Sequence, residues 1–157
     1  MKVVLDTSAI IYLNDFREFD EILTVPEVIE EVKDKTSKIK LSGINLKVVE
    51  PNFIAVKTVE TVAHTTGDLE KLSQTDIKIL ALAKENGYTI VSDDKNVQNV
   101  AEKLKINYIS IFNKKIAKFI VWRKYCKNCR RYFDSGDTCP VCGSKLVKVP
   151  VESKEVE

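Results

Sequence analysis

The sequence is poor in several features that mark large classes of protein. It holds five glycines and four prolines in 157 residues, too few for a collagen-like or low-complexity chain. No apolar run approaches the roughly 20 residues that a membrane-spanning helix requires, and charge follows Val3-Val4-Leu5 too early for a secretory signal. We therefore expect a cytoplasmic protein with no membrane partner, in which the four cysteines form no disulfide bonds.

Two common kinds of catalytic group are also missing. His64 is the single histidine of the chain, and no Ser/His or Cys/His pair of the nucleophile–base kind is recognisable. A lone histidine is more often structural than catalytic, so we assign it no catalytic role. No glycine-rich phosphate-binding loop is present either. Acidic side chains and cysteines remain as the candidates for chemistry.

The net charge of +2 hides a separation of charge along the chain. Residues 1–112 hold 14 basic and 18 acidic side chains, a net charge of −4. Residues 113–150 carry +8, from ten basic and two acidic side chains, and residues 151–157 carry −2. The basic segment contains all four cysteines. It indicates a polyanionic partner such as RNA, although a solvated charged surface would have the same composition.

Hydrophobic periodicity predicts an α/β fold for the acidic part of the chain. Short apolar runs indicate parallel strands that are buried on both faces, and helical patterns alternate with them. The strands are expected at 3–5, 46–49, 88–91 and 107–111. The helices are expected at 9–13, from near Pro26 to about Val32, and at 53–63, 76–85 and 97–104.

Two aspartates follow predicted strands, at the edge where parallel α/β sheets bind ligands. Asp6 comes after the first strand, and Asp94 follows the strand that ends near Val91. Each would also serve as the N-cap of the next helix, so a purely structural role is the alternative for either aspartate alone.

Two further acids are expected on helices. Asp76 stands three residues after Ser73, close to the spacing of a capping box. That motif prefers Glu or Gln, however, and Asp76 shares a helix face with the apolar Ile79, so we expect its carboxylate to point inward. Glu31 lies about 110° from the centre of the apolar stripe of its helix. The other two acids of that helix lie about 150° away and are expected to face solvent.

Four carboxylates that converge without basic neighbours would repel one another unless a divalent cation occupied the site. All-oxygen ligands favour Mg²⁺ or Mn²⁺ over Zn²⁺. One or two such ions suit phosphodiester hydrolysis, because one generates hydroxide and a second stabilises the leaving oxygen. We predict Asp6, Glu31, Asp76 and Asp94 as catalytic acids, with the three aspartates as ligands of the metal.

The cysteines form the most specific pattern in the chain. Cys126-x2-Cys129 and Cys139-x2-Cys142 have the spacing that places four thiolates tetrahedrally around one Zn²⁺. Four matched ligands leave no open position, so the zinc should be structural; an iron centre or a redox pair is the alternative. A module this small lacks an adequate apolar core, and the metal would supply most of its folding energy.

Basic and aromatic side chains surround this predicted zinc site. Cations for phosphates and aromatic faces for bases suit single-stranded RNA, although some aromatic residues, Trp122 above all, are expected to pack within the ribbon. The RNA-binding candidates are Lys124, Lys127, Arg130, Arg131, Tyr132 and Lys145.

The chain then divides into four parts. We expect an α/β domain at 1–112, a connecting segment at 113–123, a zinc ribbon at 124–150 and a disordered acidic tail at 151–157.

The arrangement of the acids resembles that of the PIN-domain nucleases. Their pattern is an N-terminal strand ending in Asp, a helical Glu, a helix-borne Asp and Ser-x-Asp after a late strand, here Ser92-Asp93-Asp94. The resemblance implies a Rossmann-like three-layer fold and metal-dependent RNA cleavage by the four acids, with Asp93 taking part indirectly.

A PIN domain followed by a zinc ribbon is similar to the Nin-one-binding-protein family, the endonuclease that matures the 3′ end of small-subunit rRNA. The matching segments are Leu5-Asp6-Thr7-Ser8, Val28-Ile29-Glu30-Glu31-Val32-Lys33-Asp34, Thr66-Gly67-Asp68, Leu72-Ser73-x-Thr75-Asp76-Ile77 and Asp93-Asp94-x3-Gln98-Asn99-Val100-Ala101. In that family the Glu before the hydrophobic–Lys–Asp step is catalytic, which agrees with Glu31. The chain lacks the long insertions of eukaryotic members and resembles a compact, archaeal-type version. The family implies precursor 16S-type rRNA as substrate and the assembling small ribosomal subunit as partner; it leaves the oligomeric state open.

Two other functions stay open. A toxin-type PIN ribonuclease that cuts tRNA or mRNA accounts for the acids but not for the ribbon, and it would need a cognate antitoxin. A non-catalytic RNA-binding adaptor accounts for the ribbon, but the presence of all four acids argues against a degenerate site.

Overall fold

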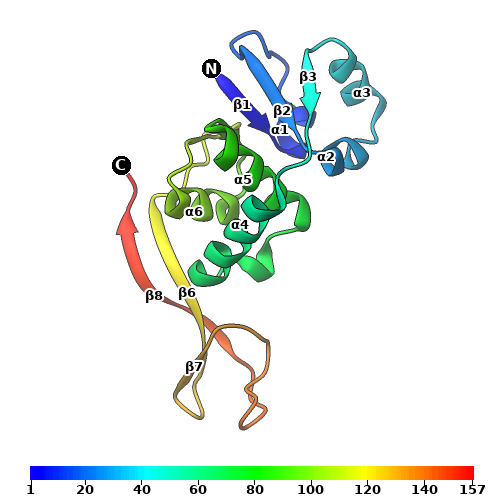
Figure 1. The fold of residues 1–157 in the computed structure, drawn as a ribbon. Coiled ribbons are helices and arrows are strands. Elements are labelled where there is room, and N and C mark those ends of the chain that lie inside the picture. Colours follow the sequence, from blue (N-terminus) through cyan, green and yellow to red (C-terminus); the bar gives the residue numbers. More distant parts are fainter.

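The N-terminal domain of the computed structural model, which describes residues 1–157, is built on a five-stranded parallel sheet (Figure 1). The strand order is β3-β2-β1-β4-β5. The strands are β1 (Lys2–Leu5), β2 (Glu21–Thr24), β3 (Leu46–Val48), β4 (Thr89–Val91) and β5 (Tyr108–Ile109). Because β1 pairs with both β2 and β4, the residues that follow β1 and β4 emerge side by side at one edge of the sheet.

Helices connect the strands and cover the sheet. They are α1 (Thr7–Tyr12), α2 (Pro26–Glu31), α3 (Lys35–Ser42), α4 (Phe53–Thr66), α5 (Gln74–Asn86) and α6 (Lys95–Leu104), with a 3₁₀ turn η1 (Leu69–Lys71). In Figure 1, α4, α5 and α6 lie together between the parallel sheet and the C-terminal strands. None of the helices has the length and apolar character that crossing a membrane requires.

The core confirms the predicted α/β pattern. Val3, Val4 and Leu5 of β1 are fully buried, as expected for a central parallel strand covered on both faces. Residues 79–83 of α5 are at most 1% exposed, because this helix contacts α4, α6, β1 and β4. Gly87 ends α5 with φ of +69°, a left-handed conformation that glycine adopts without a Cβ clash.

Two elements were absent from the sequence-based prediction. The strand β2 begins with the charged Glu21 and forms because it pairs with both β1 and β3, a long-range contact that local hydrophobicity does not report. The helix α3 has no apolar stripe, and its Ile39 is 64% exposed. Its start is fixed instead by Asp34, whose side chain accepts a hydrogen bond from Ser37 N. The helix α4 also continues three residues past its predicted end, to Thr66.

The C-terminal part is an antiparallel sheet of order β7-β6-β8. Its strands are β6 (Lys118–Cys126), β7 (Arg131–Phe133) and β8 (Val147–Glu155). The expectation of a disordered tail at 151–157 is wrong, because β8 continues to Glu155, which pairs with Lys118 of β6. This pairing sets opposite charges across the two strands. The predicted division at residue 124 falls inside β6, so the connecting segment and the ribbon share one strand.

Hydrogen bonds fasten β6 to the N-terminal domain. Asn99 of α6 holds the backbone of Ile120 at both ends: its Nδ2 donates to Ile120 O at 2.7 Å, and its Oδ1 accepts from Ile120 N at 2.9 Å. The same Nδ2 donates to Asp68 Oδ2 at 2.7 Å, which also accepts from Thr66 Oγ1 at 2.6 Å. The side chains of α6 and of the α4–α5 connection therefore set the position of β6.

Close backbone packing reinforces this attachment. Gly67 has φ of +80°, and a Cβ built on it would lie 2.1 Å from Trp122 O, so no larger residue fits there without displacing β6. Beyond it, Gly136 N donates to Glu70 Oε1 at 2.9 Å, and Lys124 Nζ lies 3.7 Å from Glu70 Oε2. The ribbon is thus seated against the turn η1 that carries Glu70.

Candidate active site and metal-binding ribbon

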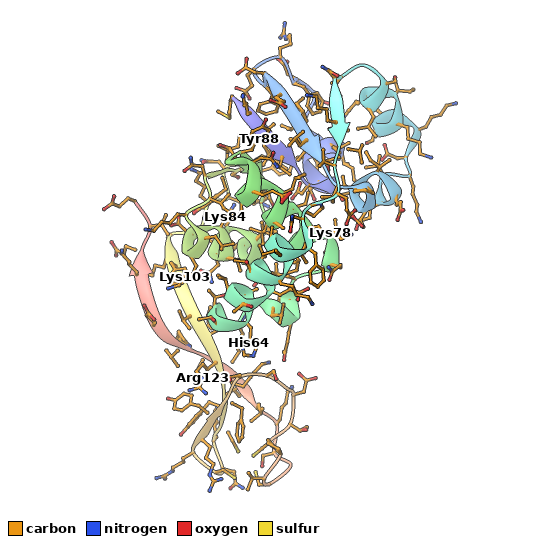
Figure 2. The ribbon with its side chains drawn as sticks, in the orientation of Figure 1. His64, Lys78, Lys84, Tyr88, Lys103 and Arg123 are labelled. Atoms are coloured by element: carbon orange, nitrogen blue, oxygen red, sulfur yellow. The ribbon has the colours of Figure 1, made fainter.

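One cavity at the carboxyl edge of the parallel sheet brings the four predicted acids together. It has a volume of about 340 Å³ and is lined only by polar side chains. Its lining residues are Asp6, Thr7, Ser8, Glu31, Thr75, Asp76, Asp93 and Asp94. We call it the acidic cavity. Neither a basic residue nor His64 lines it; His64 lies in the last turn of α4, on the side of the molecule that faces Arg123 and the ribbon (Figure 2).

Asp6 and Asp94 each cap a helix and also line the acidic cavity. Asp6 Oδ1 accepts from Ala9 N at 2.7 Å at the start of α1. Asp94 Oδ1 accepts from Asn96 N at 2.8 Å and from Val97 N at 3.1 Å at the start of α6. The structural and functional interpretations of these aspartates are therefore compatible. Both caps use only Oδ1, which fixes each carboxylate in place.

Asp76 closes a complete capping box at the start of α5. Ser73 N donates to Asp76 Oδ2 at 3.0 Å, and Asp76 N donates to Ser73 Oγ at 3.1 Å. The preference of this motif for Glu or Gln thus does not exclude Asp, and the expectation that the carboxylate points into the protein interior needs correction. Asp76 is only partly buried, and it lies on the wall of the cavity.

Glu31 is held in the acidic cavity by two threonine hydroxyls. Thr7 Oγ1 donates to Glu31 Oε2 at 2.5 Å, and Thr75 Oγ1 donates to Glu31 Oε1 at 2.7 Å. Glu27 instead pairs with Lys78, and Glu30 is exposed. The helical-wheel choice of Glu31 among the three acids of α2 therefore matches its place in the structure.

Sequence reasoning missed the hydroxyl residues, and it gave Asp93 an indirect part without showing what Asp93 contacts. Thr7 and Thr75 stand inside the motifs Asp6-Thr7-Ser8 and Ser73-x-Thr75-Asp76, but nothing in those motifs shows that both reach Glu31. Asp93 anchors the loop after β5, because its Oδ1 accepts from Ile111 N at 2.7 Å and its Oδ2 from Phe112 N at 3.0 Å. It thereby shapes the wall of the cavity.

The electrostatics of the acidic cavity call for a cation. Burial raises the pKa of Asp6 to about 6, and the charges of Asp76 and Asp94 add to this, while hydrogen bonds from Ser92 and Ala9 oppose it. Burial also raises the pKa of Asp76, with Asp94 and Glu31 contributing. These shifts mean that the carboxylates are under-solvated and repel one another. A divalent ion with oxygen ligands would relieve both effects, so the donor set fits Mg²⁺ or Mn²⁺.

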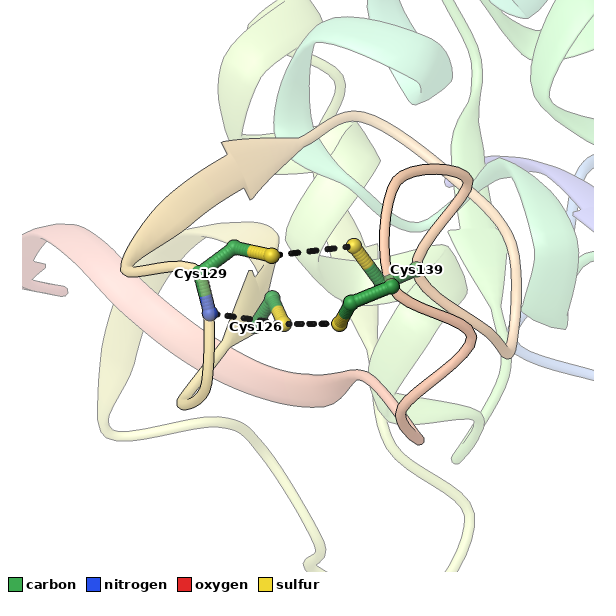
Figure 3. Close-up of side chains that lie close together, drawn as sticks. Cys126, Cys129 and Cys139 are labelled. Carbon is green, nitrogen blue, oxygen red and sulfur yellow. Dashed lines mark hydrogen bonds between the residues drawn. The ribbon is translucent and has the colours of Figure 1, made fainter.

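The four cysteine sulfurs gather at the far end of the C-terminal sheet (Figure 3). All four Sγ atoms lie within 4.8 Å of one another. The Sγ of Cys126 is 3.5 Å from that of Cys142, and the Sγ of Cys129 is 3.9 Å from that of Cys139. Tetrahedral Zn²⁺ with Zn–S bonds of about 2.3 Å requires sulfurs about 3.8 Å apart. The four sulfurs are therefore close enough together to hold one zinc ion.

The two Cys-x2-Cys segments form matching turns. After Cys129, Arg130 has φ of +57° and its N donates to Cys126 O at 2.7 Å. After Cys142, Gly143 has φ of +75° and its N donates to Cys139 O at 2.9 Å. Backbone amides also face sulfur, since Cys129 N donates to Cys126 Sγ at 3.3 Å. The sequence predicted this geometry at Gly143; the first turn achieves it with an arginine.

The six RNA-binding candidates have different surroundings. Lys127, Arg130, Arg131 and Lys145 are exposed around the cysteine cluster, and Tyr132 is half-exposed beside Arg123 and Tyr125. Lys124 is only 19% exposed and faces Glu70, so it contributes to the attachment of the ribbon. Trp122 packs as expected, with Lys148 Nζ 4.5 Å from its ring centroid.

Comparison with known proteins identifies the family of this chain. Residues 3–85 match the family model for the PIN domain of ribonuclease. The chain is 40% identical to the endoribonuclease Nob1 of Archaeoglobus fulgidus over 149 residues, which cover 92% of this chain and 88% of the relative. It is 36% identical to the ribonuclease VapC1 of Thermoplasma acidophilum over 149 residues, 93% of this chain and 77% of the relative. It is also 40% identical over 89 residues to the 20S-pre-rRNA D-site endonuclease of Schizosaccharomyces pombe, 53% of this chain and 22% of the relative.

The match to the PIN model, residues 3–85, spans the strands β1 to β3, the α2 acid and the α5 acid, but ends before β4 and β5. The similarity to Nob1 extends over 92% of the chain and so includes these strands and most of the C-terminal sheet. The sequence-based recognition of the family is confirmed. The chain belongs to the PIN-domain ribonucleases, within the Nob1 endoribonuclease family.

Proposed function

We propose that this protein is a metal-dependent endoribonuclease that matures the 3′ end of precursor small-subunit, 16S-type rRNA in the cytoplasm. The observation that carries the proposal is the acidic cavity, in which the four predicted catalytic carboxylates and that of Asp93 line one pocket free of basic side chains. The similarity to Nob1 over most of the chain and to a pre-rRNA endonuclease supports the choice of substrate. The assembling small ribosomal subunit would be the partner that presents this RNA.

The residues of the acidic cavity suit hydrolysis of a phosphodiester. Asp6, Asp76 and Asp94 would hold one or two Mg²⁺ or Mn²⁺ ions, which supply Lewis acidity and a bound water of lowered pKa. Glu31, fixed by the hydroxyls of Thr7 and Thr75, would orient the attacking water. The helix caps of Asp6 and Asp94 hold their carboxylates in place before substrate arrives, so little reorganisation is needed during the reaction.

The ribbon would contribute affinity for RNA. We propose that Cys126, Cys129, Cys139 and Cys142 bind one structural Zn²⁺, which holds the two turns that carry the exposed cations. Lys127, Arg130, Arg131 and Lys145 would then contact phosphates, and Tyr132 a base. Because the ribbon is attached rigidly through β6, RNA bound there would lie in a fixed relation to the acidic cavity.

A toxin-type ribonuclease is the second candidate, because the chain is also similar to a protein named ribonuclease VapC1. That similarity covers 93% of this chain, so it does not separate the candidates. The substrate does: a toxin-type enzyme would cut tRNA or mRNA rather than precursor rRNA.

The two candidates are distinguished by mapping cleavage sites. The protein is incubated with Mg²⁺ or Mn²⁺ and three RNAs: a fragment spanning the 3′ end of precursor small-subunit rRNA, a tRNA and an mRNA. We expect one cut at the 3′ end of the rRNA and a rate at least about a hundredfold lower for Asp94→Asn, which loses a charged metal ligand. Site-specific cutting of tRNA or mRNA alone would establish the toxin-type activity, and RNA binding without any cleavage would establish a non-catalytic adaptor.

A further inference from the structure

Two exposed aromatic side chains pair on the surface of the N-terminal domain. Tyr12, the last residue of α1, is 56% exposed, and Phe112, in the loop after β5, is 54% exposed. Their ring centroids are 5.4 Å apart, with an interplanar angle of 65°. We call these two residues the aromatic pair. Side chains of this size that remain half-exposed contribute little to the core, and aromatic residues are enriched where proteins contact other molecules.

Each residue of the aromatic pair is linked to a residue that lines the acidic cavity. Tyr12 stands four residues after Ser8, so the two side chains share one face of α1, and Ser8 lines the cavity. The backbone of Phe112 is held by Asp93, whose Oδ2 accepts from Phe112 N at 3.0 Å, and Asp93 also lines the cavity. A residue of the cavity wall thus holds the backbone of Phe112, and Tyr12 stands one helical turn after another such residue, Ser8.

Cations flank the aromatic pair. Lys114 Nζ lies 6.0 Å from the ring centroid of Phe112, and Lys40 Nζ donates to Ile11 O at 2.7 Å, next to Tyr12. A free anion such as phosphate would use the cations but not the rings, and an apolar partner would use the rings but not the cations. An unpaired nucleotide uses both, because its base stacks on an aromatic face and its phosphate attracts ammonium groups.

We propose that the aromatic pair stacks an unpaired base of the RNA substrate immediately beside the scissile phosphate, with Lys114 near the adjoining backbone phosphate. This inference rests on the proposed function, because the RNA is taken to be cut in the acidic cavity. It adds an RNA contact on the N-terminal domain to the contacts predicted for the ribbon, which lies at the opposite end of the molecule from α1 (Figure 1). Tyr12 and Phe112 are binding residues in this scheme and take no part in the chemistry.

The chain offers a matched control for this proposal. Phe53, at the start of α4, is 72% exposed, and Lys57 Nζ lies 5.3 Å from its ring centroid. It therefore has the same exposed ring and neighbouring ammonium group as Phe112, but it stands on α4, which contributes no residue to the acidic cavity. Phe112→Ala, Tyr12→Ala and Phe53→Ala remove comparable exposed surface, so a general loss of apolar surface would affect all three variants alike.

The test measures RNA affinity separately from cleavage. Each variant is combined with Asp94→Asn to prevent cutting, and its affinity is determined by fluorescence anisotropy for an unpaired oligoribonucleotide spanning the 3′ end of the rRNA and for an unrelated unpaired oligoribonucleotide of equal length. We expect Phe112→Ala and Tyr12→Ala to weaken binding by about tenfold, within the range found for removal of one stacked base. Phe53→Ala should change it less than about twofold. The contribution should appear with both RNAs, because stacking tolerates any base.

Abasic substitution identifies the stacked position. Replacing one base beside the cut by an abasic ribose should weaken binding to the Asp94→Asn parent about tenfold and should have no further effect in the Phe112→Ala variant, because both changes remove the same interaction. Equal affinities of the Phe112→Ala and Phe53→Ala variants, or additive effects at every abasic position, would overturn the proposal. Failure of the cleavage-competent protein to cut at the rRNA 3′ end would instead overturn the proposed function, and the affinity comparison on both RNAs would still decide the role of the aromatic pair.

Discussion

Thr7 and Glu31 join two helices across the acidic cavity, with Thr7 Oγ1 2.5 Å from Glu31 Oε2. Thr75 completes the arrangement from α5, with its Oγ1 2.7 Å from Glu31 Oε1. Both oxygens of Glu31 are therefore held by hydroxyls from elements far apart in the chain. This places the carboxylate beside the three aspartates even though Glu31 itself is exposed at the end of α2. The activity should depend on these hydroxyls.

Replacing Thr75 by Val tests this dependence. Val keeps the shape of a side chain that is 8% exposed but cannot donate to Glu31, so the carboxylate should lose its fixed orientation. We expect single-turnover cleavage to fall about tenfold, as for removal of one hydrogen bond to a charged group, with RNA affinity unchanged. Thr75→Ser retains the hydroxyl and should keep most of the rate. If Val and Ser variants cleave equally fast, the hydroxyl has no part in catalysis.

Much of the fold and of the acidic cavity was predictable from local sequence patterns. The buried runs of β1 and β4 and the apolar run at residues 79–83 of α5 report their own burial, and Asp6 and Asp94 follow strands whose carboxyl ends must meet in a parallel sheet. The cysteine spacing likewise predicted the cluster, because the ligands lie close in sequence.

The parts that escaped prediction depend on contacts between distant segments. The strand β2 buries Ile22 and Leu23, but this apolar run is too short to identify the strand without its pairing to β1 and β3. The strand β8 reaches Glu155 because it lies against β6, although its last residues are polar. Thr7 and Thr75 donate hydrogen bonds to Glu31 from segments distant in the chain, and Tyr12 meets Phe112 from a hundred residues away. Lys124 was predicted to face RNA but faces Glu70. None of these relationships produces a periodic signal along the chain.

The raised pKa of Asp6 predicts a pH-dependent cost to stability in the absence of metal. Because the folded-state pKa is about 6 against an ordinary 3.8, the folded protein retains a proton that the unfolded chain releases between about pH 4 and 6. Stability should therefore fall as pH rises through this window, by at most about 3 kcal/mol from this group. Asp6→Asn removes the charge and keeps an N-cap. Thermal unfolding in the presence of chelator should show that the variant is more stable than the parent at pH 7 and equally stable at pH 4. A stability difference of the same size at both pH values would contradict the raised pKa of Asp6.

Replacing Gly67 by Ala tests how much the close packing of Gly67 against β6 contributes to the stability of the protein. Ala at this position would have an unfavourable φ of +80° and a Cβ 2.1 Å from Trp122 O, so β6 must move. Gly87 provides the control, because it has φ of +69° and no atom within 4 Å of its Cβ position. We expect Gly87→Ala to cost about 1 kcal/mol and Gly67→Ala at least about 2 kcal/mol in denaturant unfolding. Equal costs for the two variants would mean that the packing against β6 yields without penalty.

Removal of zinc should affect one part of the protein. The cysteine turns have only a small cluster of buried residues around them, Cys126, Cys139 and Leu146, so their order depends on the metal. Chelation should abolish hydrogen-exchange protection at Arg130 N and Gly143 N and leave β1 and β4 protected. Elemental analysis should find one zinc per chain. Simultaneous melting of both parts, or the absence of zinc from a folded ribbon, would contradict this account.

The separation of charge along the chain predicts where RNA affinity resides. The α/β domain carries −4 and the segment 113–150 carries +8, which four zinc-bound thiolates would reduce by about two. Arg130→Ala combined with Arg131→Ala should therefore weaken RNA binding and flatten its log–log salt dependence by roughly one unit for each phosphate that the variant no longer binds. The cut position should not change, because the acidic cavity is intact.

Lys103→Ala combined with Lys105→Ala is the matched control for this charge removal. Lys103 and Lys105 are exposed at the end of α6, and Figure 2 shows Lys103 outside the ribbon. Lys105 has φ of +58°, close to the +57° of Arg130, so both double variants lose two charges and place Ala at a left-handed position. Titrations at several salt concentrations should show a smaller slope for the arginine variant alone. Equal slopes of log affinity against log salt concentration for the two variants would show that only net charge matters. If the arginine variant binds RNA as tightly as the parent at every salt concentration, the ribbon docks on protein rather than on RNA.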